Sequence, residues 1–573
     1  MLVAACGSTI DPIPSTAPSP TPPKLTPAPT SGPFIKAAYP ATGAAPCGQA
    51  APPDASHGAY AGNLKRISAK DARTVVFELC GPDVAFLSRI ASPAFSINDA
   101  GWLTSHVDPK VTGQQAIVTA VNGTGPYRLE AWSTGTEVSL ARNPAYWGPP
   151  AKNERVIVRW TTDPAQRVKE LQDGTVDGID AVDAAGVSAM TDDVALALQA
   201  RPGLDVFYLG FNDTLAPFDD EKVRQAIAIG IDRQHIVDTF FPPGSQLASR
   251  YTPCAVPHGC AGARWYDYDP TLAKETLASA GYPDGFDTTI HYQATPTPSL
   301  PDPAGVASEI QAELLANLGI NATLVVEPAA TFPAAVDAGK VDGIHLLGQT
   351  ADYPDITAFL DPRFGSGASA EFGKRFTDIG NALAAGDATA DPGKRETAYA
   401  RANNAIRTHV PMVPIADSGS TVAYRADVSG ASASALGLDR FASMTPGDRR
   451  QLVWLTTTEP GGLYCADESD PVSSLVCAQV MDTLYSYDPA TGAPVPSLAQ
   501  RCVANADLTI WTCTLRSGVL FSDGSVADAN DVVLSLAVQW DAAHPLHLGH
   551  TGAFRTFQSM FGGFLNPPPT PGG

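Results

Sequence analysis

The sequence predicts an α/β protein of two lobes joined by hinge strands. In residues 164–180 a predicted helix, a glycine stop and a Val-Asp-Gly-Ile strand follow one another, and the same order returns in residues 332–348. This recurrence suits two lobes of similar local construction. Two apolar strands, at residues 205–212 and 410–416, can carry the chain from one lobe to the other and back. Two such crossings form a hinge.

Length and charge narrow the classes of function. At about 100–200 residues per domain, 573 residues allow several domains or one large bilobal body. The formal net charge of -22 disfavours nucleic acid as a partner, because phosphate binding rests on clustered Lys and Arg. No stretch of 18 or more apolar residues occurs, so we expect the chain to be anchored to a membrane and not to span it.

The first residues, Leu-Val-Ala-Ala-Cys-Gly, resemble a bacterial lipobox. The resemblance implies that Cys6 carries a lipid, that residues 1–5 are the remnant of a signal peptide, and that the start of the gene is truncated. Residues 6–33 are rich in Pro, Thr, Ser and Ala and cannot bury a core, so they predict an extended tether. The alternative is that Ala-Ala-Cys arose by chance.

The other eight cysteines predict disulfides, because an even number in an exported protein is typical of them. Cys254 and Cys260 bracket a Pro-rich turn, and Cys502 and Cys513 flank a turn that would place them on facing strands. Proximity and elimination then suggest two further pairs, Cys465 with Cys477 and Cys47 with Cys80. A metal site is the alternative, but no C-x-x-C occurs and no His clusters nearby, so neither a metal nor a cofactor is expected.

The remaining elements follow from periodicity and turn residues. They are two strands in residues 63–79, a helix at 83–90, a strand at 155–160, a helix at 164–173, one helix spanning 218–241, helices at 269–280, 308–318 and 394–409, and a strand at 321–327.

Residues 122–148 predict a β-hairpin, because two β-rich runs are separated by Gly-containing turns and bounded by Pro126 and Pro144. The pattern GTGPY…W…G…V.L.RNP.YWG within it resembles the signature of the solute-binding proteins of peptide-type ABC importers, family 5. The resemblance implies a two-lobed periplasmic-binding-protein fold (type II, cluster C-like). It also implies an extracytoplasmic protein, lipid-anchored and monomeric, that captures a small solute, most often a peptide, and delivers it to ABC permease subunits.

Residues 348–355, GQTADYPD, follow a predicted strand and resemble the family loop GW.ADYPDP. Open α/β sheets bind ligands at strand ends of this kind. In peptide-binding members the residue that matches Asp352 pairs with the α-ammonium of the ligand, so Asp352, Tyr353 and Gln349 are candidate ligand-binding residues. Gln349 replaces the usual Trp, and Asp352 could instead cap a helix that starts near Ile356. Asn212 and Glu459, each near the end of a predicted strand, complete the candidate site.

The order of the segments departs from the family. Residues 451–565 resemble the amino-terminal part of family 5 proteins, whereas the part that follows it in the family begins here near Tyr60. The sequence therefore predicts a circular permutation; two partial copies from a fusion or an assembly artefact are the alternative. The expected organisation is residues 34–212 for part of lobe I, 213–411 for lobe II, 412–449 for the return to lobe I, 450–566 for the displaced lobe I segment, and 567–573 for a disordered tail.

No G-x-S-x-G elbow, H-E-x-x-H helix, Walker loop or Rossmann fingerprint occurs, so the chain is not expected to be an enzyme. A secreted hydrolase or a cell-surface interaction protein that reuses the fold is the alternative.

Overall fold

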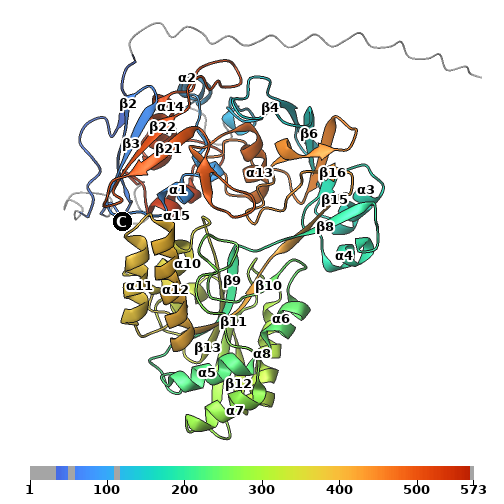
Figure 1. Cartoon of the computed structure of the whole chain (residues 1–573), viewed down its shortest axis with the longest axis vertical. Helices are drawn as coiled ribbons and strands as arrows, with labels where there is room; N and C mark the ends of the chain where they lie inside the picture. The colour runs from blue at the N-terminus through green and yellow to red at the C-terminus, as the bar shows by residue number, and fades with distance from the viewer. Residues whose placement is uncertain (1–33, 49–58, 109–115, 568–573) are drawn as a thin grey trace, which may run out of the picture.

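A computed structural model describes residues 34–48, 59–108 and 116–567, which form two α/β lobes (Figure 1). Lobe I, the upper one in Figure 1, contains a five-stranded and a seven-stranded sheet, and lobe II contains a six-stranded sheet. The predicted two-lobed α/β class is therefore confirmed. Cys6, the tether and most of the predicted tail lie outside the described residues. Among the residues described, no helix combines the length and apolar character needed to cross a membrane.

The sheet of lobe II is mixed, in the order β10-β14-β9-β13-β11-β12. Its central strand β9 is buried along its whole length, which accounts for the unbroken apolar sequence there. The strands are β9 (Asp205–Phe211), β10 (Gln246–Leu247), β11 (Asp287–Gln293), β12 (Asn321–Glu327), β13 (Ile344–Thr350) and β14 (Met412–Asp417).

Helices cover the lobe II sheet. They are α5 (Glu221–Gly230), α6 (Arg233–Phe240), α7 (Pro270–Ser279), α8 (Pro303–Leu318), α9 (Phe332–Asp337), α10 (Thr357–Phe364), α11 (Thr377–Asp387) and α12 (Pro392–His409). The prediction of one helix over residues 218–241 is wrong. The segment forms two helices because the Asp232 side chain accepts a hydrogen bond from the His235 amide and starts a new helix.

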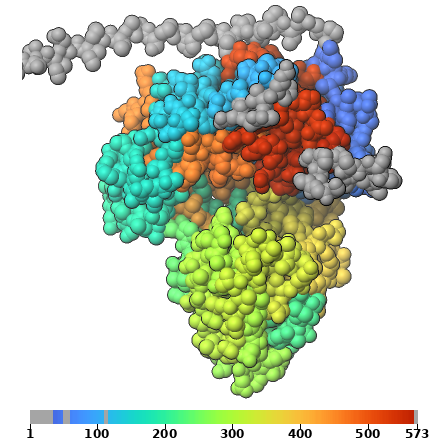
Figure 2. Space-filling model, turned by 180° about the vertical axis from the view of Figure 1, so that it is seen from behind, coloured from blue at the N-terminus to red at the C-terminus, as the bar shows by residue number. Residues whose placement is uncertain are grey.

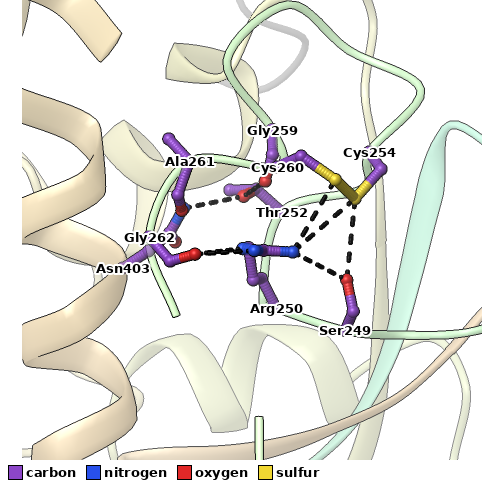
Figure 3. The surroundings of a disulfide bond; sticks show 9 residues. All are labelled: Ser249, Arg250, Thr252, Cys254, Gly259, Cys260, Ala261, Gly262 and Asn403. Carbon is purple, nitrogen blue, oxygen red and sulfur yellow. Dashed lines mark hydrogen bonds between the residues drawn. A yellow bond between two sulfur atoms is a disulfide. The ribbon is translucent and has the colours of Figure 1, made fainter. Parts of the chain in front are cut away.

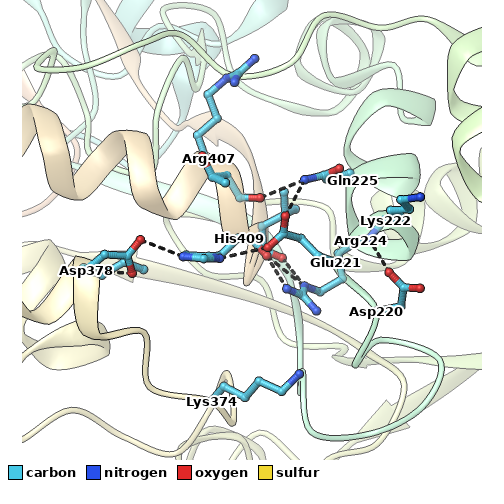
Figure 4. Close-up of polar contacts among 12 residues, drawn as sticks. Asp220, Glu221, Lys222, Arg224, Gln225, Lys374, Asp378, Arg407 and His409 are labelled. Carbon is cyan, nitrogen blue, oxygen red and sulfur yellow. Dashed lines mark hydrogen bonds and ion pairs between the residues drawn. The ribbon is translucent and has the colours of Figure 1, made fainter. Parts of the chain in front are cut away.

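Figure 4 shows how three of these helices are held together just before the chain leaves lobe II. His409, at the end of α12, lies between Glu221 of α5 and Asp378 of α11, with N···O distances of 3.0 and 2.9 Å. Arg224 of α5 donates to the carbonyl oxygens of His409 and Val410, the latter at 2.9 Å. The start of β14 is therefore tied to α5 and α11.

Most helices begin at an aspartate, which uses part of the acidic charge of the chain. An Asp side chain accepts a hydrogen bond from an amide of the first turn in five helices of lobe II, α5, α6, α7, α8 and α12. The same holds in five helices of lobe I, α2 (Ala100–His106), α3 (Pro164–Gln172), α4 (Ala184–Met190), α13 (Pro471–Val480) and α14 (Ala529–Trp540). In α3, α7, α8, α12 and α13 a proline follows this aspartate, at a position where its missing N–H costs nothing. The predictions that placed the starts of α8 and α12 at residues 308 and 394 overlooked this Asp-Pro signal.

The larger sheet of lobe I has the order β4-β5-β6-β18-β7-β15-β8. Its central strand β18 comes from the carboxyl-terminal segment and pairs in parallel with β6 and β7. The predicted hairpin of residues 122–148 is confirmed as β4 and β5. The strands are β4 (Tyr127–Ser133), β5 (Glu137–Arg142), β6 (Arg155–Trp160), β7 (Gly178–Ile179), β8 (Leu196–Arg201), β15 (Ser420–Arg425) and β18 (Gln451–Thr456), and the helices α3 (Pro164–Gln172), α4 (Ala184–Met190) and α13 (Pro471–Val480) belong to the same region.

The smaller sheet of lobe I is antiparallel, in the order β1-β2-β3-β22-β21. Here too the carboxyl-terminal segment completes the sheet, because β22 pairs with β3. The strands are β1 (Ala38–Tyr39), β2 (Leu64–Asp71), β3 (Thr74–Leu79), β21 (Ala499–Ala504) and β22 (Ile510–Leu515), with helices α1 (Phe86–Arg89), α2 (Ala100–His106), α14 (Ala529–Trp540) and α15 (Arg555–Phe561). Two short antiparallel strand pairs lie outside the three larger sheets. They are β16 (Val428–Ser429) with β17 (Thr445–Pro446), and β19 (Tyr485–Tyr487) with β20 (Pro494–Pro496).

The two crossings between the lobes are short and lie against each other. Both predicted hinge strands, β9 and β14, belong to the lobe II sheet, so the crossings fall at residues 202–204 and 418–419 and not at the predicted boundaries of 212 and 411. A Cβ on Gly203 would lie 2.0 Å from the Ser418 carbonyl oxygen. The amide of Ser418 donates to Asp205 Oδ1 at 2.7 Å. The close backbone contact therefore requires glycine at position 203.

All four predicted disulfides are formed: Cys47–Cys80, Cys254–Cys260, Cys465–Cys477 and Cys502–Cys513. Figure 3 shows the second of these beside Arg250, whose Nη2 donates to the Gly262 carbonyl at 2.6 Å. Asn403 of α12 donates to Thr252 Oγ1 at 3.1 Å. The small disulfide loop is thereby fastened to lobe II.

Candidate functional site

A cleft of about 780 Å³ lies between the lobes, where the space-filling view in Figure 2 narrows to a waist. Lobe II lines it with Asp205 at the start of β9, with the loop after β13, and with Pro242, Thr297, Pro298 and Pro301. Lobe I lines it with residues 92–94, with the loop before α13, and with the first turns of α15. The volume falls in the range of about 300–1,000 Å³ typical of sites for small molecules.

Asp352 lies in this cleft, in the loop that follows β13. Its side chain is exposed and makes no hydrogen bond or ion pair with any described residue. The alternative prediction, that Asp352 caps a helix, does not hold: the N-cap of α10 is Ile356, and the nearby side chain that accepts from the Thr357 amide and hydroxyl is that of Asp355. The Asp352 carboxylate is therefore free to meet a cation in the cleft.

The neighbours of Asp352 in the predicted site have structural contacts. Gln349 is buried; its Oε1 accepts from the Tyr251 hydroxyl and its Nε2 donates to the Ala358 carbonyl at 2.7 Å. Tyr353 is 6% exposed, and its hydroxyl accepts from Arg89 of lobe I at 2.8 Å. Tyr353 therefore links the two lobes, while Gln349 links the end of β13 to α10, on the far side of the Asp352 loop. Both residues also line a side pocket of about 280 Å³ next to Asp352.

Asn212 and Glu459 do not line the cleft. Asn212 lies just past the carboxyl end of β9, where its Nδ2 donates to the Gly339 carbonyl at 3.0 Å. Because β9 runs antiparallel to β13, the amino end of β9, at Asp205, lies beside the Asp352 loop. Glu459 Oε1 accepts from Trp132 Nε1 and the Gly135 amide, both at 3.0 Å, and so holds the turn of the β4–β5 hairpin.

The cleft contains two acids that the sequence analysis did not single out. Burial raises the pKa of Asp205 to about 7, against the opposing effect of the Ser418 amide. Burial also raises the pKa of Glu468 to about 7, against the opposing effect of His550, whose Nδ1 lies 3.3 Å from Glu468 Oε1. Glu468 belongs to the same loop as Glu459, nine residues further along the chain, and no motif in the sequence marks it.

Two arginines are the cationic side chains that line the cleft in the described part of the chain. Arg201 is neutralised, because its Nη2 lies 3.1 Å from Asp180 Oδ1 and 2.5 Å from Asp439 Oδ2. Arg555, the first residue of α15, is exposed. Arg363 is near Asp352 in sequence, but it does not line the cleft and forms ion pairs with Asp337 and Glu371. In the described residues no group of three or more His, Cys, Asp or Glu could hold a metal ion.

Two α/β lobes joined by two short crossings, with an open cleft between them, define the architecture of two-lobed solute-binding proteins. Residues 44–371 match the family described as bacterial extracellular solute-binding proteins, family 5 Middle, and the chain belongs to this family. The resemblance seen in the hairpin is thereby confirmed.

Several relatives agree with this assignment. The chain is 28% identical to heme-binding protein A of Haemophilus influenzae over 381 residues, which cover 66% of this chain and 69% of that protein. It is 28% identical to di/tripeptide-binding protein 1 of Pseudomonas aeruginosa over 407 residues, which cover 67% and 72%. The solved structure of HbpA2 from Haemophilus parasuis is similar with a TM-score of 0.62 at 28% identity, covering 67% of this chain and 76% of that one. The first two of these relatives are named as binding proteins.

Proposed function

We propose that this chain is the extracytoplasmic solute-binding component of an ABC importer, which captures a peptide-like polar solute between its lobes and delivers it to the permease. The observation that carries the proposal is the free carboxylate of Asp352 in the cleft. A fixed carboxylate without an internal partner gains a charge-assisted hydrogen bond when an α-ammonium group enters. The names of several relatives refer to peptides, which favours this class of solute.

The solute is tested by thermal shift with Ala-Ala-Ala, its N-acetylated form, an oligosaccharide and a nickel chelate. A ligand at a hundred times its dissociation constant stabilises the protein by about 2.7 kcal/mol. We expect the free peptide to raise the melting temperature and the N-acetylated form to bind about 10–100-fold more weakly, because a hydrogen bond to a charged group contributes about 1.5–3 kcal/mol.

Asp352→Asn should reduce the affinity for Ala-Ala-Ala by a similar factor, since it removes the charge and keeps the size of the side chain. Asp507→Asn is the matched control, because Asp507 is an exposed aspartate in the β21–β22 turn, outside the cleft lining. Equal affinities in the wild type and Asp352→Asn would remove Asp352 from the site. A response to the sugar or the chelate alone would overturn the peptide class.

For attachment to the cell we propose that Cys6 carries a lipid and that residues 6–33 tether a monomeric binding domain to the membrane. Mass spectrometry of the protein expressed in a bacterial host should find a diacylglycerol-modified Cys6, and Cys6→Ala should release the protein from the membrane fraction. An unmodified Cys6 in membrane-associated protein would contradict the anchor.

We also propose that the order of the segments is circularly permuted. The Asn63 amide donates to the Phe561 carbonyl at 2.7 Å, so the start of β2 lies next to the end of α15, where the family order would join them. The segment from residue 451 supplies strands to both lobe I sheets. A chain rebuilt with residues 451–565 placed before residue 60 should fold and bind the same solutes; an aggregated product would argue against the permuted order.

A further inference from the structure

Arg555 differs from the other cationic residue of the cleft, because its charged side chain has no partner among the described residues. It is exposed, it lines the cleft together with Thr556 and Ser559, and its guanidinium has no hydrogen bond or ion pair with the described residues. The other cleft arginine, Arg201, is held by two carboxylates. Arg555 is therefore the cation that remains available to an anionic group in the cleft, as far as the described residues show.

The backbone that leads into Arg555 is held in an unusual conformation. Phe554 has φ 41° and ψ 47°, in the left-handed region that a bulky L-residue rarely adopts, and its side chain is fully buried. The His547 ring lies 4.2 Å from the Phe554 ring, between centroids. Strain of this kind persists only where the surroundings over-determine it, and it gathers at ligand sites.

A single buried carboxylate supplies that constraint. Asp467, which is 4% exposed, accepts hydrogen bonds of 2.6–3.0 Å from the Thr551 hydroxyl and from the amides of Thr551, Gly552, Ala553 and Phe554. The loop from residue 551 to residue 554 is thereby wrapped around one charge. Arg555, the next residue, starts from a fixed backbone position, so a ligand that binds it has to order the side chain but not the backbone.

Arg555 and Asp352 belong to different lobes but to the same site. Arg555 lies on α15 of lobe I, and Asp352 lies on the β13–α10 loop of lobe II. Ser559, one turn along α15 from Arg555, lines the side pocket together with Asp352, so this helix and the Asp352 loop lie close together. A solute that carries a cation at one end and an anion at the other could therefore contact both lobes at once.

We propose that Arg555 binds the carboxylate of a zwitterionic solute whose ammonium group is bound by Asp352, so that the cleft selects peptides with a free carboxyl terminus. This inference rests on the function proposed above. The planar guanidinium suits the carboxylate, because it can donate two parallel hydrogen bonds. Since the two charges lie on separate lobes, a solute with both groups also stabilises the arrangement in which the lobes face each other.

The test measures affinities of the full chain for Ala-Ala-Ala, its carboxyl-terminal amide and its N-acetylated form by isothermal titration calorimetry. For the wild type we expect the free acid to bind about 10–100-fold more tightly than the amide. Arg555→Gln should reduce this preference to less than about threefold, and Arg555→Lys should retain part of it. The matched control is Arg501→Gln, an exposed arginine of β21 outside the cleft lining, which should keep the wild-type preference.

The ratio of the two affinities is measured within each variant, so a partly unfolded preparation does not change it. If the amide binds the wild type as tightly as the free acid, or if Arg555→Gln keeps the full preference, the carboxylate site is overturned. Binding of the free peptide that is unaffected by N-acetylation and by Asp352→Asn overturns the ammonium site, and with it the proposed contact of one zwitterionic solute with both lobes. Binding by none of the peptides overturns both proposals.

Discussion

Asp205 is a buried acid beside the hinge, and its charge should lower the stability of the protein as the pH rises. It is 5% exposed at the start of β9, beside the crossing, and its Oδ1 accepts from the Ser418 amide at 2.7 Å. No cation compensates its charge among the described residues, and Asp417, at the end of the neighbouring strand β14, is a second buried acid whose pKa burial and Asp205 both raise. Asp205→Asn keeps the size of the side chain and the amide hydrogen bond and removes the charge.

The magnitude follows from the pKa of Asp205, which burial raises from 3.8 to about 7. Because the folded pKa is the higher one, the folded state binds the proton more tightly. The stability from this proton is fully present below about pH 4 and is lost as the pH rises to about 7, at about 1.4 kcal/mol per pH unit. The loss in the wild type therefore amounts to about 4 kcal/mol, and Asp205→Asn avoids it.

Urea unfolding at pH 5 and pH 8 measures the effect. We expect the Asn variant to be the more stable protein at both values, with a margin over the wild type that widens by about 2–3 kcal/mol from pH 5 to pH 8. Asp507→Asn, at an exposed turn, serves as the control and should follow the wild type at both pH values. A constant margin would refute the reasoning, because it would mean that Asp205 titrates alike in the folded and unfolded chains.

Three further predictions concern the framework of the site. Asp467→Ala should lower the free energy of unfolding by about 3 kcal/mol in urea titrations, because four backbone amides lose their common acceptor, and it should also weaken peptide binding; unchanged stability would show that the 551–554 loop keeps its conformation without Asp467. Replacing Cys502 and Cys513 together by Ala should cost about 3 kcal/mol, the loop entropy expected for a sequence separation of 11, and an unchanged urea midpoint would contradict that estimate. Limited proteolysis in the 446–450 loop should not release residues 451–565 as an independent folded fragment, because β18 pairs on both sides with strands from elsewhere in the chain.

Local sequence patterns were sufficient to predict those strands whose boundaries are set by neighbouring residues in the sequence. The strand predictions at residues 155–160 and 321–327 match β6 and β12, because apolar runs of strand length are bounded there by polar turns. The helix predicted over residues 218–241 failed because its apolar stripe continues through residue 231, although Asp232 caps a new helix. Asp232 could have been identified as a cap, since Asp precedes most of the helices in this chain.

The candidate site was only partly predictable, because its members depend on strand direction and on contacts between distant segments. The motif led to Asp352, which does line the cleft. Asn212 was chosen as a strand end, but it is the wrong end: β9 runs antiparallel to β13, and no local pattern in the sequence specifies that pairing. Arg555 and Glu468 come from the segment after residue 450, and only the tertiary structure brings them opposite Asp352.

The proposed permutation is compatible with this site because it rearranges lobe I alone. The contact between residues 63 and 561, the segment after residue 450, and the loop that precedes β18 all lie in lobe I. Lobe II is formed by the uninterrupted stretch from β9 to β14, and both crossings flank that stretch. The relative motion of the lobes is therefore governed by the same two crossings in either order of the segments. The observed order of the segments has a consequence for folding: β18 is made after its neighbours β6 and β7, so the seven-stranded sheet cannot be completed before residue 456 has been synthesised.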